Sequence, residues 1–269
     1  MRQQSSLARL LASAALTAIL AAGLGGCQTM SDITGSVSPK AESSPGADPH
    51  RAAEIYGERY RADPKNAEAA LAYGQALRAT GQRSQAAAVL EQATLAHPSD
   101  KALLAAYGRA LADNGNFQQA FDVLSRAHSP DNPDWRILSV QGTTLDQLGR
   151  HEEARQYHAS ALKIVPDEPS VLSNLGLSYV LSKDLPKAEE VLRQAYASTR
   201  ADARVRQNLG LVVGLQGRFA EAEQIVRADL PADEAAANVG YLKQMLNRKD
   251  DTRTGAAPKM PIASLNHQD

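Results

Sequence analysis

The chain has 269 residues, with 29 Lys and Arg against 30 Asp and Glu, and it contains a single cysteine. One cysteine cannot form a disulfide within the chain, which excludes a disulfide-stapled scaffold. The balanced charge shows no basic stripe or aromatic platform, so nothing indicates a nucleic-acid-binding protein.

The N-terminal stretch has the layout of a secretory signal. Arg2 and Arg9 come without an acidic residue and precede an apolar run over residues 10–24. That run is shorter than the roughly 20 residues of a membrane-spanning helix, so a permanent transmembrane anchor is the weaker interpretation. We therefore expect residues 1–26 to be a signal peptide.

The end of this stretch, Leu24-Gly25-Gly26-Cys27, resembles the lipobox of bacterial lipoproteins. The resemblance implies acylation of Cys27 and cleavage before it; an ordinary cleavage site beside an unmodified thiol is the alternative. Several acyl chains, at about 0.8 kcal/mol per buried methylene, would hold the protein on a membrane. Gln28 follows, and resemblance to the known sorting rule favours the inner leaflet of the outer membrane, facing the periplasm.

Residues 27–50 are rich in Ser, Pro and Gly and nearly free of large apolar side chains. We expect this segment to be the acylated cysteine followed by a flexible tether, with an r.m.s. span of roughly 25 to 30 Å. The folded part would then stand away from the membrane.

The rest of the chain follows a period of 34 residues. Glycines recur at this spacing, and alanines recur twelve positions later: Gly74, Gly108, Gly142, Gly176 and Gly210, then Ala86, Ala120, Ala154, Ala188 and Ala222. Each period holds two runs with helical apolar spacing, separated by a turn. Small residues let two antiparallel helices approach closely, so we expect Gly74 to face Ala86 across the hairpin.

This pattern resembles the tetratricopeptide repeat. The resemblance implies an all-α, right-handed solenoid over residues 51–248, with five full repeats starting at Ala67, Lys101, Trp135, Pro169 and Ala203. A half repeat precedes them from Arg51, and a capping helix over residues 235–248 closes the last repeat. We expect residues 249–269 to be a disordered tail.

Catalytic and metal-binding motifs receive little support. His151 and His158 are seven residues apart, which does not fit the zincin spacing, and packing between neighbouring repeats is the favoured role. Gly210, Gly214 and Gly217 have no preceding strand and no following Lys-Ser/Thr, so helix packing explains them better than a phosphate loop. We expect no enzyme activity, no cofactor and no metal.

The resemblance also implies a binding groove lined by the first helix of each repeat. The residues expected to line it in repeats three to five are Arg136, Ser139, Thr143, Asp146, Ser170, Ser173, Asn174, Leu177, Val180, Leu181, Arg204, Gln207, Asn208, Leu211, Gly214 and Leu215. Asn174 and Asn208 would form a ladder that grips the backbone of an extended peptide. Alternatively, Leu177 and Leu181 pack within the protein. Repeats one and two look blander and could receive a helix.

The order of signal, lipobox, tether and repeats, together with the closing stretch ANVGYLKQML, resembles the TadD family of the tight adherence (Tad/Flp) pilus system. That resemblance implies a non-enzymatic, pilotin-like assembly factor whose partner is the Tad secretin or another pilus assembly component, with roles in adherence and biofilm formation. The rival hypotheses are an adaptor of another envelope machine (type IVa pilus assembly, outer-membrane barrel insertion or peptidoglycan enzymes), an enzyme built on the histidine pair, and a structural spacer.

Overall fold

The computed structural model describes residues 48–254, with side chains described as far as Arg248. The proposed signal peptide, Cys27, nearly all of the tether and the end of the tail lie outside these residues. The described part is helical and contains no β-strand. Its helices are α2 (Pro49–Ala62), α3 (Ala67–Ala79), α4 (Arg83–Ala96), α5 (Lys101–Asp113), α6 (Phe117–Ala127), α7 (Trp135–Gln147), α8 (His151–Ile164), α9 (Pro169–Leu181), α10 (Leu185–Tyr196), α11 (Ala203–Leu215), α12 (Phe219–Val226) and α13 (Ala232–Thr254).

The predicted repeat starts are confirmed, because α3, α5, α7, α9 and α11 begin at the five residues named from the period. Each of these helices is preceded by a polar residue whose side chain accepts a hydrogen bond from a backbone N–H of the first turn. The capping residues also keep the 34-residue spacing: Asn66, Asp100, Asp134, Glu168 and Asp202. The caps therefore fix where every repeat starts.

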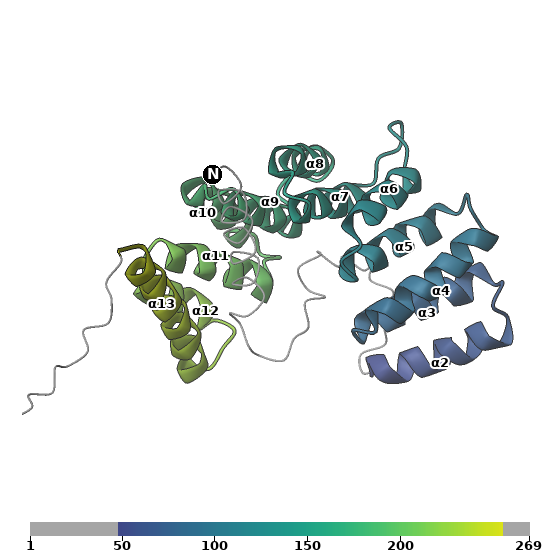
Figure 1. Ribbon diagram of the computed structural model, residues 1–269, viewed down its shortest axis with the longest axis horizontal. Coiled ribbons are helices and arrows are strands. Elements are labelled where there is room, and N and C mark those ends of the chain that lie inside the picture. Colours follow the sequence, from purple (N-terminus) through teal and green to yellow (C-terminus); the bar gives the residue numbers. More distant parts are fainter. Residues whose placement is uncertain (1–47, 255–269) are drawn as a thin grey trace, which may run out of the picture.

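The helix pairs stand side by side in an arc (Figure 1). Each first helix packs on the second helix of its own repeat and on the first helices of the neighbouring repeats. Figure 1 shows α7 on the inner side of the arc and α8 on the outer side. We call the solvent-facing side of α3, α5, α7, α9 and α11 the inner face.

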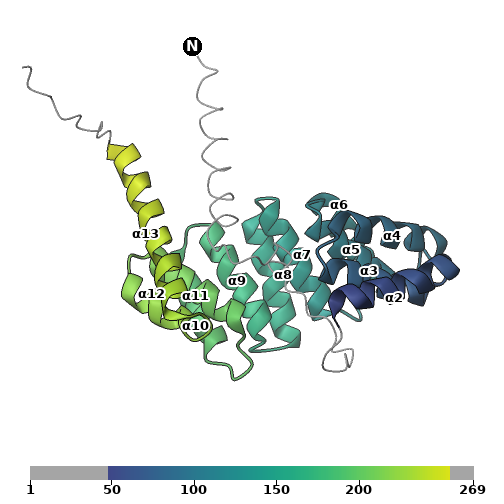
Figure 2. The same cartoon turned by 90° about the horizontal axis from the view of Figure 1, so that it is seen from below.

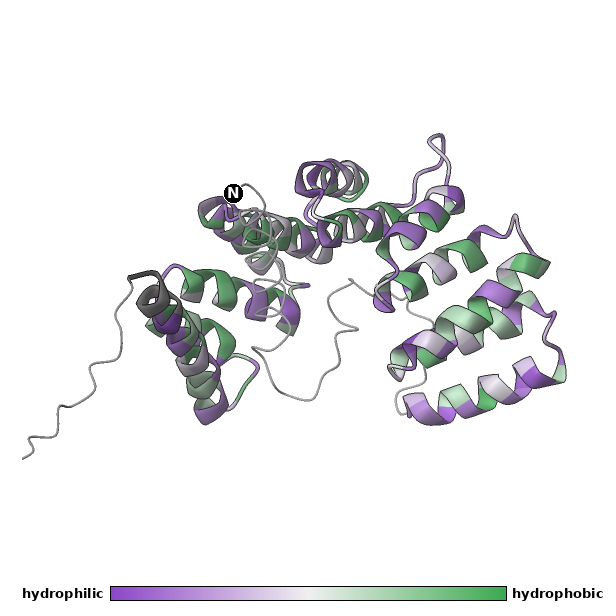
Figure 3. Ribbon diagram, viewed as in Figure 1, coloured by the Kyte–Doolittle hydropathy of each residue, from purple (hydrophilic) through white to green (hydrophobic). Residues whose placement is uncertain are grey.

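The recurring glycines are needed for packing within each repeat. A Cβ atom added at Gly74 would lie 2.5 Å from Cγ of Leu90, and one at Gly108 would lie 2.5 Å from Cγ of Leu124. The large side chain four residues after the alanine fills the space nearest each of these glycines, and the carbonyl oxygen of Ala120 also lies 3.4 Å from a Cβ placed at Gly108. Most helices carry both apolar and polar stretches (Figure 3), as expected for helices with one packed face.

The two ends of the solenoid are closed by α2 and α13, which lie at opposite ends of the row (Figure 2). Helix α2 packs on α3 as the predicted half repeat. Helix α13 covers the last repeat, since Cδ2 of Leu242 lies 2.6 Å from where a Cβ of Gly214 would be. It begins at Ala232 and continues to Thr254, so the start of the predicted tail is helical. No helix among the described residues has the length and apolar character needed to cross a bilayer.

Candidate protein-binding face

The two asparagines of the predicted ladder bond to serines of the preceding repeat. Nδ2 of Asn174 donates to Oγ of Ser139 at 3.0 Å, and Nδ2 of Asn208 donates to Oγ of Ser173 at 2.8 Å. Both serines are buried. The ladder thus ties repeat three to four and repeat four to five, and one N–H of each amide serves the solenoid itself.

The amide oxygens of the ladder have a different environment. Within the described residues, Oδ1 of Asn174 and of Asn208 takes part in no side-chain hydrogen bond and is not among the buried, unpaired polar atoms. Asn208 is half-buried, whereas Asn174 is only 9% exposed, so the oxygen of Asn208 is the more accessible acceptor for a bound chain. Each amide nitrogen also carries a second N–H that the serine bond does not use, so the expectation that each amide both donates to and accepts from a peptide stays a prediction.

Three other residues expected in the groove are taken up by internal contacts. Thr143 is buried, and its hydroxyl donates to the Ser139 carbonyl of its own helix at 3.2 Å. Asp146 is buried and bonds to side chains of α8 and α9. Gly214 lies beneath Leu242 of the capping helix. Polar or small residues at these repeat positions thus stabilise the solenoid.

The charged residues at the helix starts remain partly accessible. The guanidinium carbon of Arg136 lies 4.5 Å from the ring centroid of Trp135, and its Nε is buried without a hydrogen-bond partner. Arg204 donates from Nε and Nη2 to Oδ2 of Asp202, at 3.1 and 2.9 Å. Gln207 is half-buried beside Asn208.

Leu177, Leu181 and Leu211 form the apolar part of the inner face. All three are half-buried, and none belongs to an apolar core cluster or to the side chains packed against one within the described residues. By contrast, Val180 is buried in the core of repeats four and five and Leu215 packs against it, so the expectation that these two residues line the groove is wrong. The three leucines therefore lie next to the amide oxygens of the ladder without an internal apolar site of their own.

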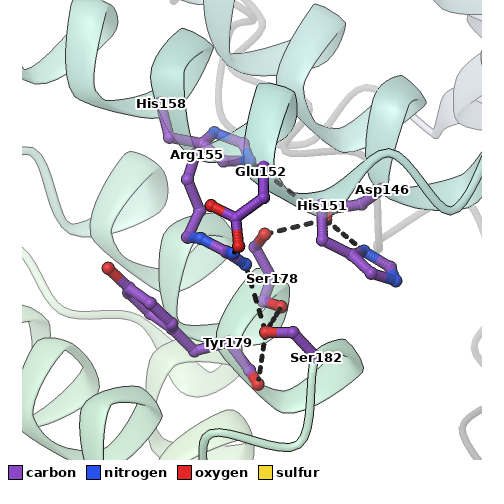
Figure 4. Close-up of polar contacts among 8 residues, drawn as sticks. All are labelled: Asp146, His151, Glu152, Arg155, His158, Ser178, Tyr179 and Ser182. Carbon is purple, nitrogen blue, oxygen red and sulfur yellow. Dashed lines mark hydrogen bonds and ion pairs between the residues drawn. The ribbon is translucent and has the colours of Figure 1, made fainter.

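The two histidines meet at Asp146, one of the residues expected in the groove (Figure 4). Nδ1 of His151 lies 2.9 Å from Oδ1 of Asp146, and Oγ of Ser178 donates to the same oxygen at 2.7 Å. His158 is fully buried, with Nε2 3.5 Å from Oδ2 of Asp146. That contact is within ion-pair distance but lacks hydrogen-bond geometry, so both ring nitrogens of His158 are buried without a hydrogen-bond partner.

The contacts with Asp146 and Gly142 hold these histidines within their own repeat. The link to the next repeat comes from Ser178. Across the described residues, no group of three His, Cys, Asp or Glu side chains is arranged to hold a metal ion. The serine hydroxyl donates to a carboxylate rather than to a histidine, so the nucleophile–base contact of a hydrolase is not formed here.

The matching family models are those of repeat proteins. Residues 49–127 match the family described as anaphase-promoting complex, cyclosome, subunit 3, and residues 145–212 match a tetratricopeptide repeat family. The chain is a tetratricopeptide-repeat protein. The matching families are not enzyme families, and this repeat fold is in general a protein-interaction scaffold. No match to a curated protein is found.

Solved structures agree with this tetratricopeptide-repeat fold. The type IV pilus biogenesis factor PilW is 19% identical with a TM-score of 0.62, over 71% of this chain and 90% of that one. PilF of Pseudomonas aeruginosa is 20% identical with a TM-score of 0.53, over 70% and 87%. Cut9-Hcn1 of the APC/C is 19% identical with a TM-score of 0.61, over 75% of this chain and 40% of that one. At these identities the likeness concerns the fold.

Proposed function

We propose that this protein is a TadD-like lipoprotein, anchored to the outer membrane through Cys27, that binds the Tad/Flp pilus secretin as a pilotin-like assembly factor. The observation that carries the binding role is the row of Leu177, Leu181 and Leu211 on the inner face, outside every described core cluster. The lipobox and the closing stretch ANVGYLKQML support the membrane anchor and the pilus system.

The inner face of repeats four and five suits an extended segment with alternating apolar side chains. The leucines would contact those side chains, while the oxygens of Asn174 and Asn208 would accept hydrogen bonds from backbone N–H groups. Both asparagines are held in place by their bonds to serines, so the acceptors are ordered before binding. Because these hydrogen bonds involve only the backbone of the ligand, the face can bind segments of different sequence.

A second candidate is an adaptor for type IVa pilus assembly. The structural likeness to PilW, over 90% of that chain, favours it among the other envelope machines. The two candidates share the fold and the anchor and differ in the secretin that is bound. Barrel insertion and peptidoglycan enzymes remain further alternatives that the same experiment separates.

Photo-cross-linking in intact cells tests the partner. A photoreactive residue replaces Asn208 on the inner face, and a matched one replaces Glu190, an exposed residue of α10. We expect mass spectrometry to find the Tad secretin joined to position 208 but not to position 190. Recovery of a type IVa secretin would favour the second candidate, and recovery of peptidoglycan enzymes alone would contradict both.

The apolar contacts are tested by polar replacements. The double variant Leu177→Gln/Leu211→Gln should reduce the cross-link from position 208 about tenfold, because half-buried leucines supply much of such an interface. Leu95→Gln is the control, since Leu95 is 71% exposed on α4. An equal yield from the double variant and the control would show that a different face binds.

The anchor is tested separately. Mass spectrometry of the mature protein should find diacylglycerol or a further acyl chain on Cys27, and Cys27→Ser should move the protein from the membrane fraction to the soluble one. An unmodified thiol in membrane-bound wild-type protein would exclude the lipid anchor and leave the binding face unaffected.

A further inference from the structure

Three arginines lie on the inner face of repeats one to three: two are in the repeats that looked bland in sequence, and the third, Arg136, is among the residues expected in the groove. Arg78, Arg109 and Arg136 come from α3, α5 and α7, the first helices of successive repeats. Each of these helices packs directly on the next. The arginines therefore follow one another along the inner face.

Acidic groups neutralise this row only in part. Nε of Arg78 lies 2.6 Å from Oδ2 of Asp113, in an ion pair whose side chains are 11% and 2% exposed. Asp134 accepts a 2.7 Å bond from the backbone N–H of Arg136 as the cap of α7. Three arginines against these two aspartates leave a net charge of 3 − 2 = +1.

Arg109 is the centre of the row and has no ion-pair or hydrogen-bond partner within the described residues. Burial lowers the pKa of its guanidinium, and the positive charges of Arg78 and Arg136 lower it further; Asp134 and Asp113 oppose the shift. Its atoms are not among the buried unpaired ones, so solvent reaches them. Arginine stays charged at neutral pH, so this is a poorly solvated cation that can still be reached by an anion.

We propose that the inner face of repeats one to three is a second binding site, centred on Arg109 and flanked by Arg78 and Arg136, for an acidic segment of a protein partner. The planar guanidinium presents paired donors that match a carboxylate.

The spacing favours a peptide over a small anion. Neighbouring packed helices are about 8 to 10 Å apart, so three of them extend over about 20 Å. An extended chain covers that distance with about six residues. The site needs neither the lipid anchor nor the contacts proposed for repeats four and five, so it stands independently of the proposed pilus function.

Fluorescence anisotropy with the purified full-length chain tests this proposal. The probe is a fluorescein-labelled peptide of four Asp-Ala repeats, and its neutral counterpart has Asn at each Asp. We expect the acidic peptide to bind, with affinity falling as salt rises, and the neutral peptide to bind at least about tenfold more weakly. Absence of binding by the acidic peptide, or equal binding of both peptides, would overturn the proposal.

Variants then locate the site. Arg109→Gln should weaken binding of the acidic peptide at least about tenfold, and Arg109→Lys should retain part of it. Arg51→Gln, an exposed arginine of α2, removes the same charge elsewhere and should leave binding unchanged. If Arg51→Gln weakens binding as much as Arg109→Gln, the attraction is a general charge effect and the site is refuted.

Two further measurements complete the test. Thermal unfolding should show Arg109→Gln folded, since the variant removes an unpaired, desolvated cation; Arg109→Met keeps the apolar stem and serves as a second variant if Gln does not fold. In the second measurement, inorganic phosphate is added as a competitor of the acidic peptide. Displacement of the peptide by equimolar phosphate would identify a general anion site and contradict the peptide assignment.

Discussion

In repeat two, Leu124 fills the space against Gly108, and in repeat three His158 fills the same space against Gly142. The residue beside this space is Ala112 in repeat two and Asp146 in repeat three. The two repeats share the same helix starts and the same caps. The same helix-pair backbone therefore accommodates either an apolar interior or a polar one, provided that the buried polar groups are partners of one another.

The difference has a consequence for the core of the whole solenoid. One apolar cluster runs through repeats one and two and ends at Val140, and another begins at Val180. Between them lie the polar contacts of Asp146 and two smaller apolar clusters. Hydrogen bonds have specific partners and apolar contacts do not, so substitutions in repeat three should be more strongly coupled than those in repeat two.

The largest effect is expected from Asp146→Ala. It leaves the buried hydroxyl of Ser178 without its acceptor, which costs about 1 to 3 kcal/mol, and it also removes the partner of the partly exposed His151 and the acid beside the buried His158. We expect the free energy of unfolding in urea to fall by about 3 kcal/mol. Asp122→Ala on the exposed side of α6 is the control and should change it by less than about 0.5 kcal/mol. A similar loss in both variants would contradict the role of the polar cluster.

Adding His158→Leu to Asp146→Ala sharpens the comparison, because the pair places the residues of repeat two in repeat three. Leucine brings no polar nitrogen into the site, whereas His158 in the single variant loses its nearby acid. We expect the double variant to recover about 2 kcal/mol of the loss, measured as a coupling energy in a double-mutant cycle. A coupling energy near zero would mean that the two side chains act separately.

The positions of the paired helices could be predicted from the sequence because the packing between them admits no side chain at the recurring glycines. A side chain at Gly74 or Gly108 would overlap the leucine beside it, so the spacing of small residues reports the spacing of the helices. Helix caps repeat with the same period, and they are a signal from which the repeat starts could have been read independently.

The polar contacts could not be predicted in the same way. The position of a residue within the repeat predicts which side of the helix it usually occupies. Asp146 departs from this expectation and is buried, because His151, His158 and Ser178 supply its partners. The direction of Asn174 likewise depends on Ser139 in the preceding repeat. Such partners become visible in sequence only when adjacent repeats are compared as pairs.

The smallest effect is expected at the turn between the paired helices, where repeats three and four also differ. Gly149 has φ 76° in repeat three, and Lys183 has φ 65° at the corresponding place in repeat four. The left-handed conformation costs a residue with a Cβ about 1 kcal/mol, and replacing that residue by glycine removes this cost. Part of the stabilisation is lost again, because glycine has greater conformational freedom in the unfolded chain. We expect Lys183→Gly to raise the free energy of unfolding by about 0.5 kcal/mol.

The reverse change provides the control for this turn. A Cβ at Gly149 would meet nothing within 4 Å, so Gly149→Ala tests the backbone conformation without a steric clash. We expect it to lower the free energy of unfolding by about 1 kcal/mol. Opposite signs for the two variants would show that the turn conformation is common to both repeats and that Lys183 is tolerated at a cost; equal signs would mean that its side chain stabilises repeat four in another way.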